Sequence, residues 1–254
     1  MSRDPDWLAP DWSAPGVGAL MTTRAGGCSA APFDSMNLQR GGGDADDAVA
    51  RNRVRLAESI GAAPVWLHQV HGARVVRLTD ADAAPGAPTQ SADASVTTVA
   101  GVACAVQVAD CLPVLFAAPQ GRAVGAAHAG WRGLAAGVLE ATVAALCEAA
   151  ACEPAALQAW LGAAIGPSRF QVGADVLQAF DAAPEGDAAF VLERPGKWLG
   201  DLPLLARRRL AHAGVSRVFG GRWCTVETPS RFFSYRRDRI TGRMAAAVWI
   251  ERGR

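Results

Sequence analysis

Residues 102–130 read VACAVQVADCLPVLFAAPQGRAVGAAHAG, and this stretch decides the fold class of the chain. Short apolar runs separated by polar or glycine-containing turns are typical of buried β-strands. The stretch therefore predicts three strands, at Val102–Val108, Val114–Ala117 and Ala123–Ala127. Ala94–Thr98, just before it, fits a fourth strand.

Outward from this stretch the chain alternates less regularly between strands and helices. Asp46–Ile60 has acidic residues at its start and Gly61 at its end, which predicts a helix with both boundaries marked. The other expected helices are Leu134–Ala150, Gly173–Phe180 and Asp201–Ala213. The other expected strands are Gly16–Thr23, Val65–Val70, Arg74–Leu78, Leu157–Ile165, Val215–Phe219 and Met244–Ile250, with Val65–Val70 and Arg74–Leu78 as neighbours.

The expected strands outnumber the helices and cluster together, which favours an α+β fold of mixed sheets flanked by helices over a doubly wound sheet. Residues 78–91 form a loop rich in Ala, Pro, Asp and Gly, but apolar runs flank it on both sides. It is interpreted as a surface excursion within one domain that spans residues 1–254.

Composition excludes several classes of protein. Half of the 254 residues are hydrophobic, 19% are charged and the net charge is +1, values that fit a globular protein rather than a disordered chain or a basic nucleic-acid binder. No apolar stretch reaches the roughly 20 residues of a membrane span, and the N-terminal residues lack a signal-peptide pattern. The expected location is the cytoplasm, where the six cysteines would be thiols.

Three short strings carry candidate ligands: HQVHG (68–72), ADCLP (109–113) and AHAGWRG (127–133). A cysteine with two histidines and an open fourth position is a catalytic zinc arrangement in which the metal activates water at neutral pH. If residues 68–72 are extended, His68 and His71 face opposite sides, and one of them reaches a given site. The Asp110–Cys111 pair, followed by Pro113, fits a strand end rather than a sheet interior.

The same residues allow two other interpretations. Cys111 with a histidine base and Asp110 nearby is also the inventory of a cysteine hydrolase. Cys111 could equally be a buried thiol beside hydrogen-bonded structural histidines. The spacing in the sequence contains no short metal-binding motif that decides among them.

Polar residues in three further segments suggest substrate contacts. Arg24, in TTRAGG, is a candidate clamp for an oxyanion or phosphate because guanidinium forks match phosphate oxygens. Phe233 and Arg236, in FFSYRRD, could stack on and clamp a nucleoside, although a core phenylalanine beside a solvated arginine is an equal alternative. Asn37 lies in the apolar triplet MNL and is a weaker candidate.

Taken together, MTTRAGG, MNL, NR, HQVHG, ADCLPV, AHAGWRG, AIGP, CT, FFSYRRD and TGRMA follow the order of one known family. From about residue 16 to 251 the chain resembles the YfiH-type family, first described as laccase-domain or multicopper polyphenol oxidoreductases and later as purine nucleoside phosphorylases. It departs from the family pattern at Ser168–Phe170 after the IGP motif, where a cysteine is often seen, and at Arg239, which replaces a usual glycine.

The resemblance implies an α+β domain and one zinc ion held by His71, Cys111 and His128. It also implies phosphorolysis of adenosine, inosine, guanosine and S-methyl-5′-thioadenosine, with adenosine deamination as a further activity and peptidoglycan editing as another role assigned to members. Four histidines in the whole chain cannot build a multicopper cluster, so one zinc, or one copper in its place, is all the ligands support.

The sequence therefore predicts a zinc enzyme that acts on purine nucleosides and phosphate, with no nucleic acid or membrane partner. It does not define the oligomeric state. Asp110 would move protons during deamination, and Arg24 would hold phosphate. The alternatives are a metal-free cysteine hydrolase using Cys111, in peptidoglycan precursor editing for example, a copper-dependent polyphenol oxidase, and a non-catalytic protein with a structural zinc.

Overall fold

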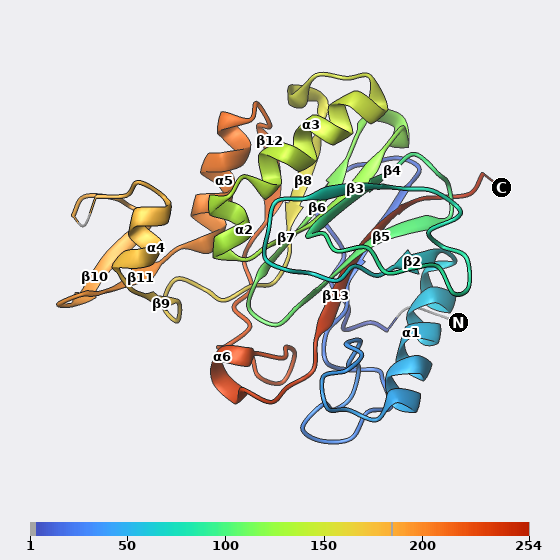
Figure 1. Cartoon of the computed structure of the whole chain (residues 1–254), viewed down its shortest axis with the longest axis horizontal. Coiled ribbons are helices and arrows are strands. Elements are labelled where there is room, and N and C mark those ends of the chain that lie inside the picture. The colour runs from blue at the N-terminus through green and yellow to red at the C-terminus, as the bar shows by residue number, and fades with distance from the viewer. Residues whose placement is uncertain (1–3, 184, 254) are drawn as a thin grey trace.

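The stretch 102–130 divides its strands between two sheets. In the computed structural model, which describes residues 4–183 and 185–253, it forms β5 (Val102–Val108), β6 (Leu112–Ala117) and β7 (Val124–Ala129). β6 and β7 are central in a six-stranded sheet of order β12-β8-β6-β7-β4-β3, whereas β5 lies in a four-stranded sheet of order β1-β13-β5-β2. The chain therefore crosses from one sheet to the other at residues 109–111 (Figure 1).

The remaining strands complete these sheets and a small third one. The four-stranded sheet also contains β1 (Val17–Met21), β2 (Ala63–Val65) and β13 (Met244–Ile250), and the six-stranded sheet contains β3 (Val75–Leu78), β4 (Ala94–Thr97), β8 (Gln158–Leu161) and β12 (Arg217–Gly220). The third sheet has the order β10-β11-β9 and is built from β9 (Gln171–Val172), β10 (Phe190–Arg194) and β11 (Lys197–Gly200).

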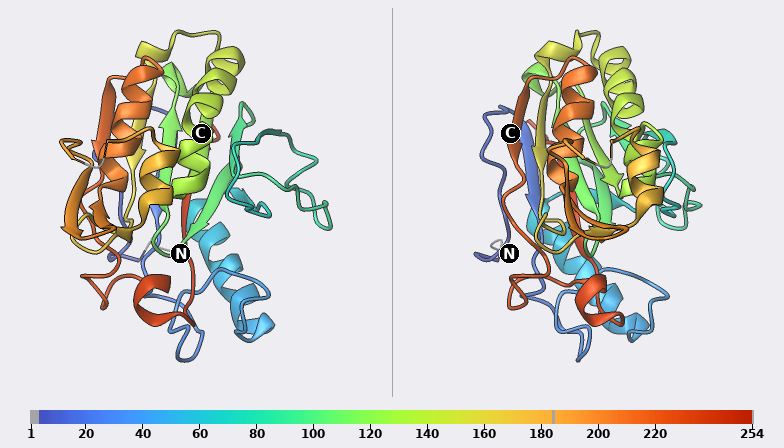
Figure 2. Two further views of the ribbon diagram at one scale, coloured as in Figure 1. Left: turned by 60° about the vertical axis from the view of Figure 1, so that its left-hand side comes forward. Right: turned by 90° about the vertical axis from the view of Figure 1, so that its left-hand side faces the viewer.

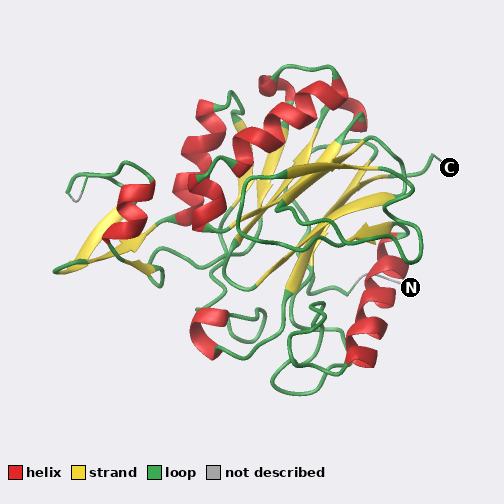
Figure 3. Cartoon of the chain, viewed as in Figure 1, coloured by secondary structure: helices red, strands yellow, loops and turns green. Residues whose placement is uncertain are grey.

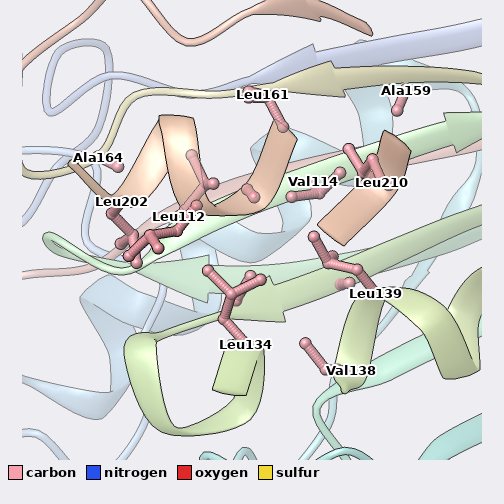
Figure 4. Packing of buried hydrophobic residues seen from close by; sticks show 14 of the residues in the cluster. Leu112, Val114, Leu134, Val138, Leu139, Ala159, Leu161, Ala164, Leu202 and Leu210 are labelled. Atoms are coloured by element: carbon pink, nitrogen blue, oxygen red, sulfur yellow. The ribbon is translucent and has the colours of Figure 1, made fainter. Parts of the chain in front are cut away.

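Apolar side chains fill the space between the two large sheets and cover the far face of the six-stranded one. Between the sheets lie residues such as Met21, Val106 and Leu115. The far face of the six-stranded sheet packs against α2 (Trp131–Ala135), α3 (Val138–Ala150) and α5 (Leu202–His212), as Figure 4 shows. Helix α1 (Asp46–Ile60) lies at one end of the four-stranded sheet (Figure 2), where Leu56 and Ile60 pack in one cluster with residues of that sheet such as Ala103 and Ala245.

Helix α1 forms where the sequence predicts it. Ala48, Val49, Asn52, Leu56 and Ile60 recur every three or four residues and form its buried face. Asp46 and Asp47 lie in its first turn, where acidic groups favour the helix dipole, and Gly61 ends it with a left-handed φ of 64°. The predicted bounds are confirmed because every local signal agrees.

Two predictions of local structure are wrong. Val65–Val70 is not a strand and is not the neighbour of Arg74–Leu78, because β2 ends at Val65 and pairs with β5, whereas β3 pairs with β4 in the other sheet. The helix predicted over Leu134–Ala150 is two helices, α2 and α3, since Gly137 between them has a φ of 91° that no helix contains.

The strands of the small sheet and the turn at residues 235–238 form structure that the sequence patterns did not predict, whereas the helix expected at Gly173–Phe180 is confirmed as α4 (Ala174–Ala179). The small sheet and α4 project from one end of the molecule (Figure 3). α6 (Tyr235–Asp238), a single turn capped by Ser234, precedes β13. The strands of the small sheet and α6 are too short for hydrophobic periodicity to reveal them.

The mixed sheets and their flanking helices confirm the α+β class expected from the sequence. Among the described residues no helix has both the length and the apolar character needed to cross a bilayer.

Candidate metal centre

His71, Cys111 and His128 meet at one point although 57 positions separate the first from the last. One ligand atom from each lies within 4.8 Å of the others, and Cys111 Sγ is 3.8 Å from His71 Nε2. The two imidazole rings meet edge to face with their centroids 4.8 Å apart. Within residues 4–183 and 185–253 this is the one group of at least three His, Cys, Asp or Glu side chains with metal-binding spacing.

The strand register brings Cys111 beside His128. β6 and β7 are antiparallel, with Leu112 opposite Ala129 and Pro113 opposite His128. Cys111 therefore lies directly before β6 at the edge where β7 ends. The predicted strand end at residues 110–111 is confirmed, because β5 stops at Val108 and Asp110 adopts a left-handed φ of 99°.

A third strand supplies a buried carboxylate to the same edge. β4 is antiparallel to β7, with Ala94 opposite Ala127, so Asp93 lies across from His128. Asp93 is fully buried, and its Oδ1 is 2.8 Å from Nδ1 of His128. Because Nδ1 is occupied by this contact, Nε2 is the His128 nitrogen left for the centre.

The same carboxylate anchors the loop that carries His71. Asp93 accepts hydrogen bonds from the backbone N–H groups of Val70 (3.1 Å), His71 (2.9 Å) and Gly72 (2.7 Å). His68 forms a β-bridge with Ser91, but the chain bends at His71, which has a φ of 62°. Residues 68–72 are therefore not the continuous extended segment on which the opposite-facing geometry of His68 depends. His71 belongs to the triad, and His68 lies on the wall of the cavity described below.

The charges of the triad favour a metal-binding thiolate. Burial raises the pKa of the Cys111 thiol, but the adjacent His128 and His71 lower it more, to about 6. Burial lowers the pKa of His128, while Cys111 and Asp93 raise it more, to about 9. Both shifts favour a thiolate beside an imidazolium, and a bound cation would take the place of the imidazolium proton.

The space around the triad also fits a bound ion. Gly130 lies so close to the triad that a Cβ at this position would be 2.9 Å from Cys111 Sγ and 3.0 Å from His71 Cδ2. Thiolate and imidazole are ligands that zinc prefers, and three protein ligands leave one position of a tetrahedral site open. The residues present therefore fit a catalytic rather than a structural zinc site.

Asp110 has a different environment from that of the triad. Its Oδ1 accepts a 2.6 Å hydrogen bond from Thr225 Oγ1, and its Oδ2 accepts a 2.6 Å bond from the backbone N–H of Arg236. Asp110 thus ties the turn before Cys111 to the start of α6. It is not one of the residues that line the cavity.

Arg24 and Phe233 lie together, away from the cavity wall. The guanidinium of Arg24 donates to the carbonyls of Asp34 (2.9 Å) and Pro229 (3.0 Å), forms an ion pair with the Asp34 carboxylate at 3.1 Å, and lies 4.9 Å from the centroid of the Phe233 ring. Phe233 is completely buried. In this arrangement Arg24 joins two loops of the protein.

Asn37 and Arg236 also make contacts within the protein. Asn37 is buried and its side chain bonds Asp44 (2.9 Å) and the backbone N–H of Arg243 (2.9 Å). Arg236 Nη1 donates to the carbonyl of Gln171 at 3.2 Å. Neither residue lines the cavity.

The triad lies on the wall of a cavity of about 800 Å³. Its other walls mix apolar side chains with polar and basic ones. They come from helix α1 and the loop before it, the residues that follow β2, the loop before β4, the end of β5, helix α6 and the segment before β13. They include Gln39, Arg40, Arg53, Trp66, Leu67, His68, Gln69, Thr89, Ser91, Gln107, Val108, Ala109, Tyr235 and Arg243.

Sequence reasoning missed several of these residues. Asp93 had a detectable signal, since it is an acid within the apolar run that begins β4. Arg53, Trp66 and Gln107 had none, because they reach the cavity from three separate elements. Tyr235 and Arg243 lie in FFSYRRD and TGRMA, two of the motifs shared with the family, but nothing in the local sequence pattern distinguishes them from their neighbours.

Known proteins resemble this chain over nearly its whole length. The family model described as multi-copper polyphenol oxidoreductase laccase matches residues 18–251. The purine nucleoside phosphorylase YfiH of Escherichia coli K12 is 48% identical over 248 residues, which cover 96% of this chain and 98% of that relative. A purine nucleoside phosphorylase of Xylella fastidiosa strain 9a5c is 51% identical over 264 residues, covering 98% and 99%.

Solved structures agree with the fold. The crystal structure of the Neisseria meningitidis protein NMB0706 superimposes with a TM-score of 0.90 at 47% identity, and the match covers 97% of this chain and 100% of that one. The structural match thus spans both large sheets.

Proposed function

The chain is an enzyme of the YfiH-type purine nucleoside phosphorylase family, and we propose that it is a zinc-dependent purine nucleoside phosphorylase. The family model that matches it carries the laccase description. The proposed substrates of the enzyme are adenosine, inosine, guanosine and S-methyl-5′-thioadenosine together with phosphate, in the cytoplasm. Deamination of adenosine is proposed as its second activity.

The observation that carries this proposal is the placement of the His71–Cys111–His128 triad on the wall of the 800 Å³ cavity. A cavity of this size lies within the range of small-molecule sites and has room for a nucleoside beside phosphate. The described residues supply one triad and therefore one metal, which argues against the several ligated coppers of a laccase.

In this proposal the three ligands hold zinc, which when bound would polarise a substrate oxygen or activate water. Asp93 orients the ring of His128 and anchors the backbone of His71. Tyr235, half exposed at the cavity, offers a ring on which a purine can stack. Asp110 bonds Thr225 and the backbone N–H of Arg236. These bonds fix the position of α6, which carries Tyr235, relative to the turn that carries Cys111.

The test is to incubate zinc-loaded protein with adenosine, with and without phosphate, and to separate the products by chromatography. Adenine that forms only with phosphate demonstrates phosphorolysis, and inosine that forms in either case demonstrates deamination. Cys111→Ser should abolish adenine formation. The absence of adenine with all four nucleosides in the presence of phosphate would refute the proposal.

A metal-free cysteine hydrolase is a second candidate, favoured by the lowered pKa of Cys111 and the Asp93–His128 contact. Alkylation separates the two. A zinc-bound thiolate should react with iodoacetamide much more slowly than the thiolate of the chelated protein. Equal rates, with full activity after chelation, would favour the hydrolase.

A further inference from the structure

Three arginine side chains, Arg40, Arg53 and Arg243, line the cavity on walls away from the triad strands. Within the described part of the chain none of them forms an ion pair with a carboxylate, whereas arginines such as Arg24, Arg208 and Arg209 do, each with a partner within 3.1 Å. The cavity therefore carries positive charge that no acidic side chain pairs with directly.

Arg53 is half-buried in this wall and its stem is fixed. Its Nε donates to the carbonyl of Leu38 at 2.9 Å, and its guanidinium carbon lies 4.3 Å from the centroid of the Trp66 ring. The same carbonyl accepts a 2.6 Å hydrogen bond from Gln107 Nε2. The two terminal nitrogens of Arg53 have no hydrogen-bond partner among the described residues, so they are free to bind a ligand.

Burial of Arg53 without a counter-ion has an energetic cost. Burial, together with the like charge of Arg40, lowers the pKa of Arg53 to about 10. A charge partly withdrawn from water without a counter-ion is destabilised unless an opposite charge or hydrogen bonds compensate for it. A ligand that carries negative charge would remove this cost.

Arg243 extends the positive wall toward the metal centre. One of its terminal nitrogens donates to the carbonyls of Thr241 and Gly242, each at 3.1 Å, and its guanidinium lies 5.6 Å from the centroid of the Tyr235 ring. Burial lowers its pKa, and attraction to the charges of Cys111 and Asp110 acts in the opposite direction. Both of these anions have their own partners, the triad and Thr225 with the Arg236 backbone.

We propose that Arg53 and Arg243, with Arg40 beside Arg53, form the subsite that binds a phosphoryl anion next to the metal centre. Arginine forks match phosphate oxygens in geometry and charge, and the fixed stem of Arg53 reduces the entropy lost on binding. The assignment of the anion as free phosphate rests on the proposed function. Esterified phosphate of a nucleotide or sugar nucleotide has the same chemistry.

The experiment measures binding without turnover. Inorganic phosphate is titrated calorimetrically into zinc-loaded protein, and adenosine 5′-monophosphate is titrated in a separate arm. Arg53→Gln and Arg243→Gln should each weaken anion binding about tenfold or more, the loss expected when a charged hydrogen bond is removed. Arg53→Lys should recover part of the affinity because it keeps the charge.

Two variants control for folding and for general loss of charge. Arg55 lies on the same helix as Arg53 but is exposed and outside this cavity. The phosphate affinity of Arg55→Gln should therefore stay within twofold of that of wild type. Arg40 is exposed, so Arg40→Gln should fold normally and weaken binding by a smaller factor. If folded Arg53→Gln and Arg40→Gln proteins bind both anions like wild type, the proposal is overturned.

The two arms also separate this subsite from the proposed function. Arginine-dependent binding of phosphate, in a protein that forms no adenine, would support the subsite and refute phosphorolysis. Arginine-dependent binding of the monophosphate alone would support the subsite with an esterified ligand. Failure of wild type to bind either anion would overturn the subsite, even if adenine forms.

Discussion

Oδ1 of Asp93 lies 2.8 Å from Nδ1 of His128, and neither side chain is more than 4% exposed. Since the same carboxylate also accepts the backbone N–H of His71, one buried acid holds the ring of one ligand and the backbone of a second. Partners of metal-binding histidines fix the ring and its tautomer in this way. The contact is the tertiary interaction on which the geometry of the centre depends most directly.

Asp93→Asn should weaken zinc affinity by about 10–100-fold, the range typical of lost partners of metal ligands. An asparagine offers one acceptor oxygen where Asp93 serves four donors, so its amide group would face N–H groups that it cannot bond. Competition with a fluorescent zinc chelator measures the change. Asp82→Asn, in the exposed 79–91 loop, is the control, and equal zinc affinity of the two variants would contradict the role of Asp93.

Removal of a ligand should remove the metal. Elemental analysis of His71→Ala, Cys111→Ala and His128→Ala is expected to show well under one zinc per chain, because a tetrahedral site with three protein ligands cannot lose one without a large loss of affinity. His68→Ala should keep the metal, since His68 is outside the triad. Zinc loss from His68→Ala, with zinc retained in His71→Ala, would reverse the choice of ligand.

Gly130→Ala should disturb the centre without unfolding the protein. Its backbone φ of −63° accepts alanine, but the new Cβ would be 2.9 Å from Cys111 Sγ and 3.0 Å from His71 Cδ2, so the ligands must move. Zinc affinity should fall at least tenfold, on the order of the loss caused by removing a partner of a ligand. Gly72→Ala is the matched control, because its Cβ would have no neighbour closer than 3.7 Å; equal affinity of the two variants would refute the crowding argument.

Arg24→Ala distinguishes a structural from a phosphate-binding role. Loss of the bonds to Asp34 and Pro229 should lower the free energy of unfolding by about 1–3 kcal/mol, as for other hydrogen bonds to charged groups. Chemical denaturation measures this change. The ratio of adenine to inosine formed from adenosine with phosphate should match wild type, whereas a strong fall in the ratio would place Arg24 at the phosphate.

Local pattern alone was sufficient for several elements. The acidic start, apolar spacing and terminal glycine of α1 all lie within the helix itself, and β5 and β13 are continuous apolar runs. Where one residue overrides the pattern, the prediction failed, as at Gly137, whose left-handed backbone divides the predicted helix. The chemistry of Cys111 and His128 as candidate ligands was also visible, because a thiol and an imidazole at strand ends are unusual.

Only the tertiary structure decided which residues share the site. Strand register sets Cys111, Asp93 and His128 side by side, and register depends on how two sheets bury their faces against each other, which no local window contains. For the same reason the sequence cannot show which of Arg24 and Arg53 has a guanidinium free to bind a ligand. Contacts with Asp34 and Pro229 engage Arg24, whereas burial against Trp66 leaves the terminal nitrogens of Arg53 unbonded among the described residues, at the cavity.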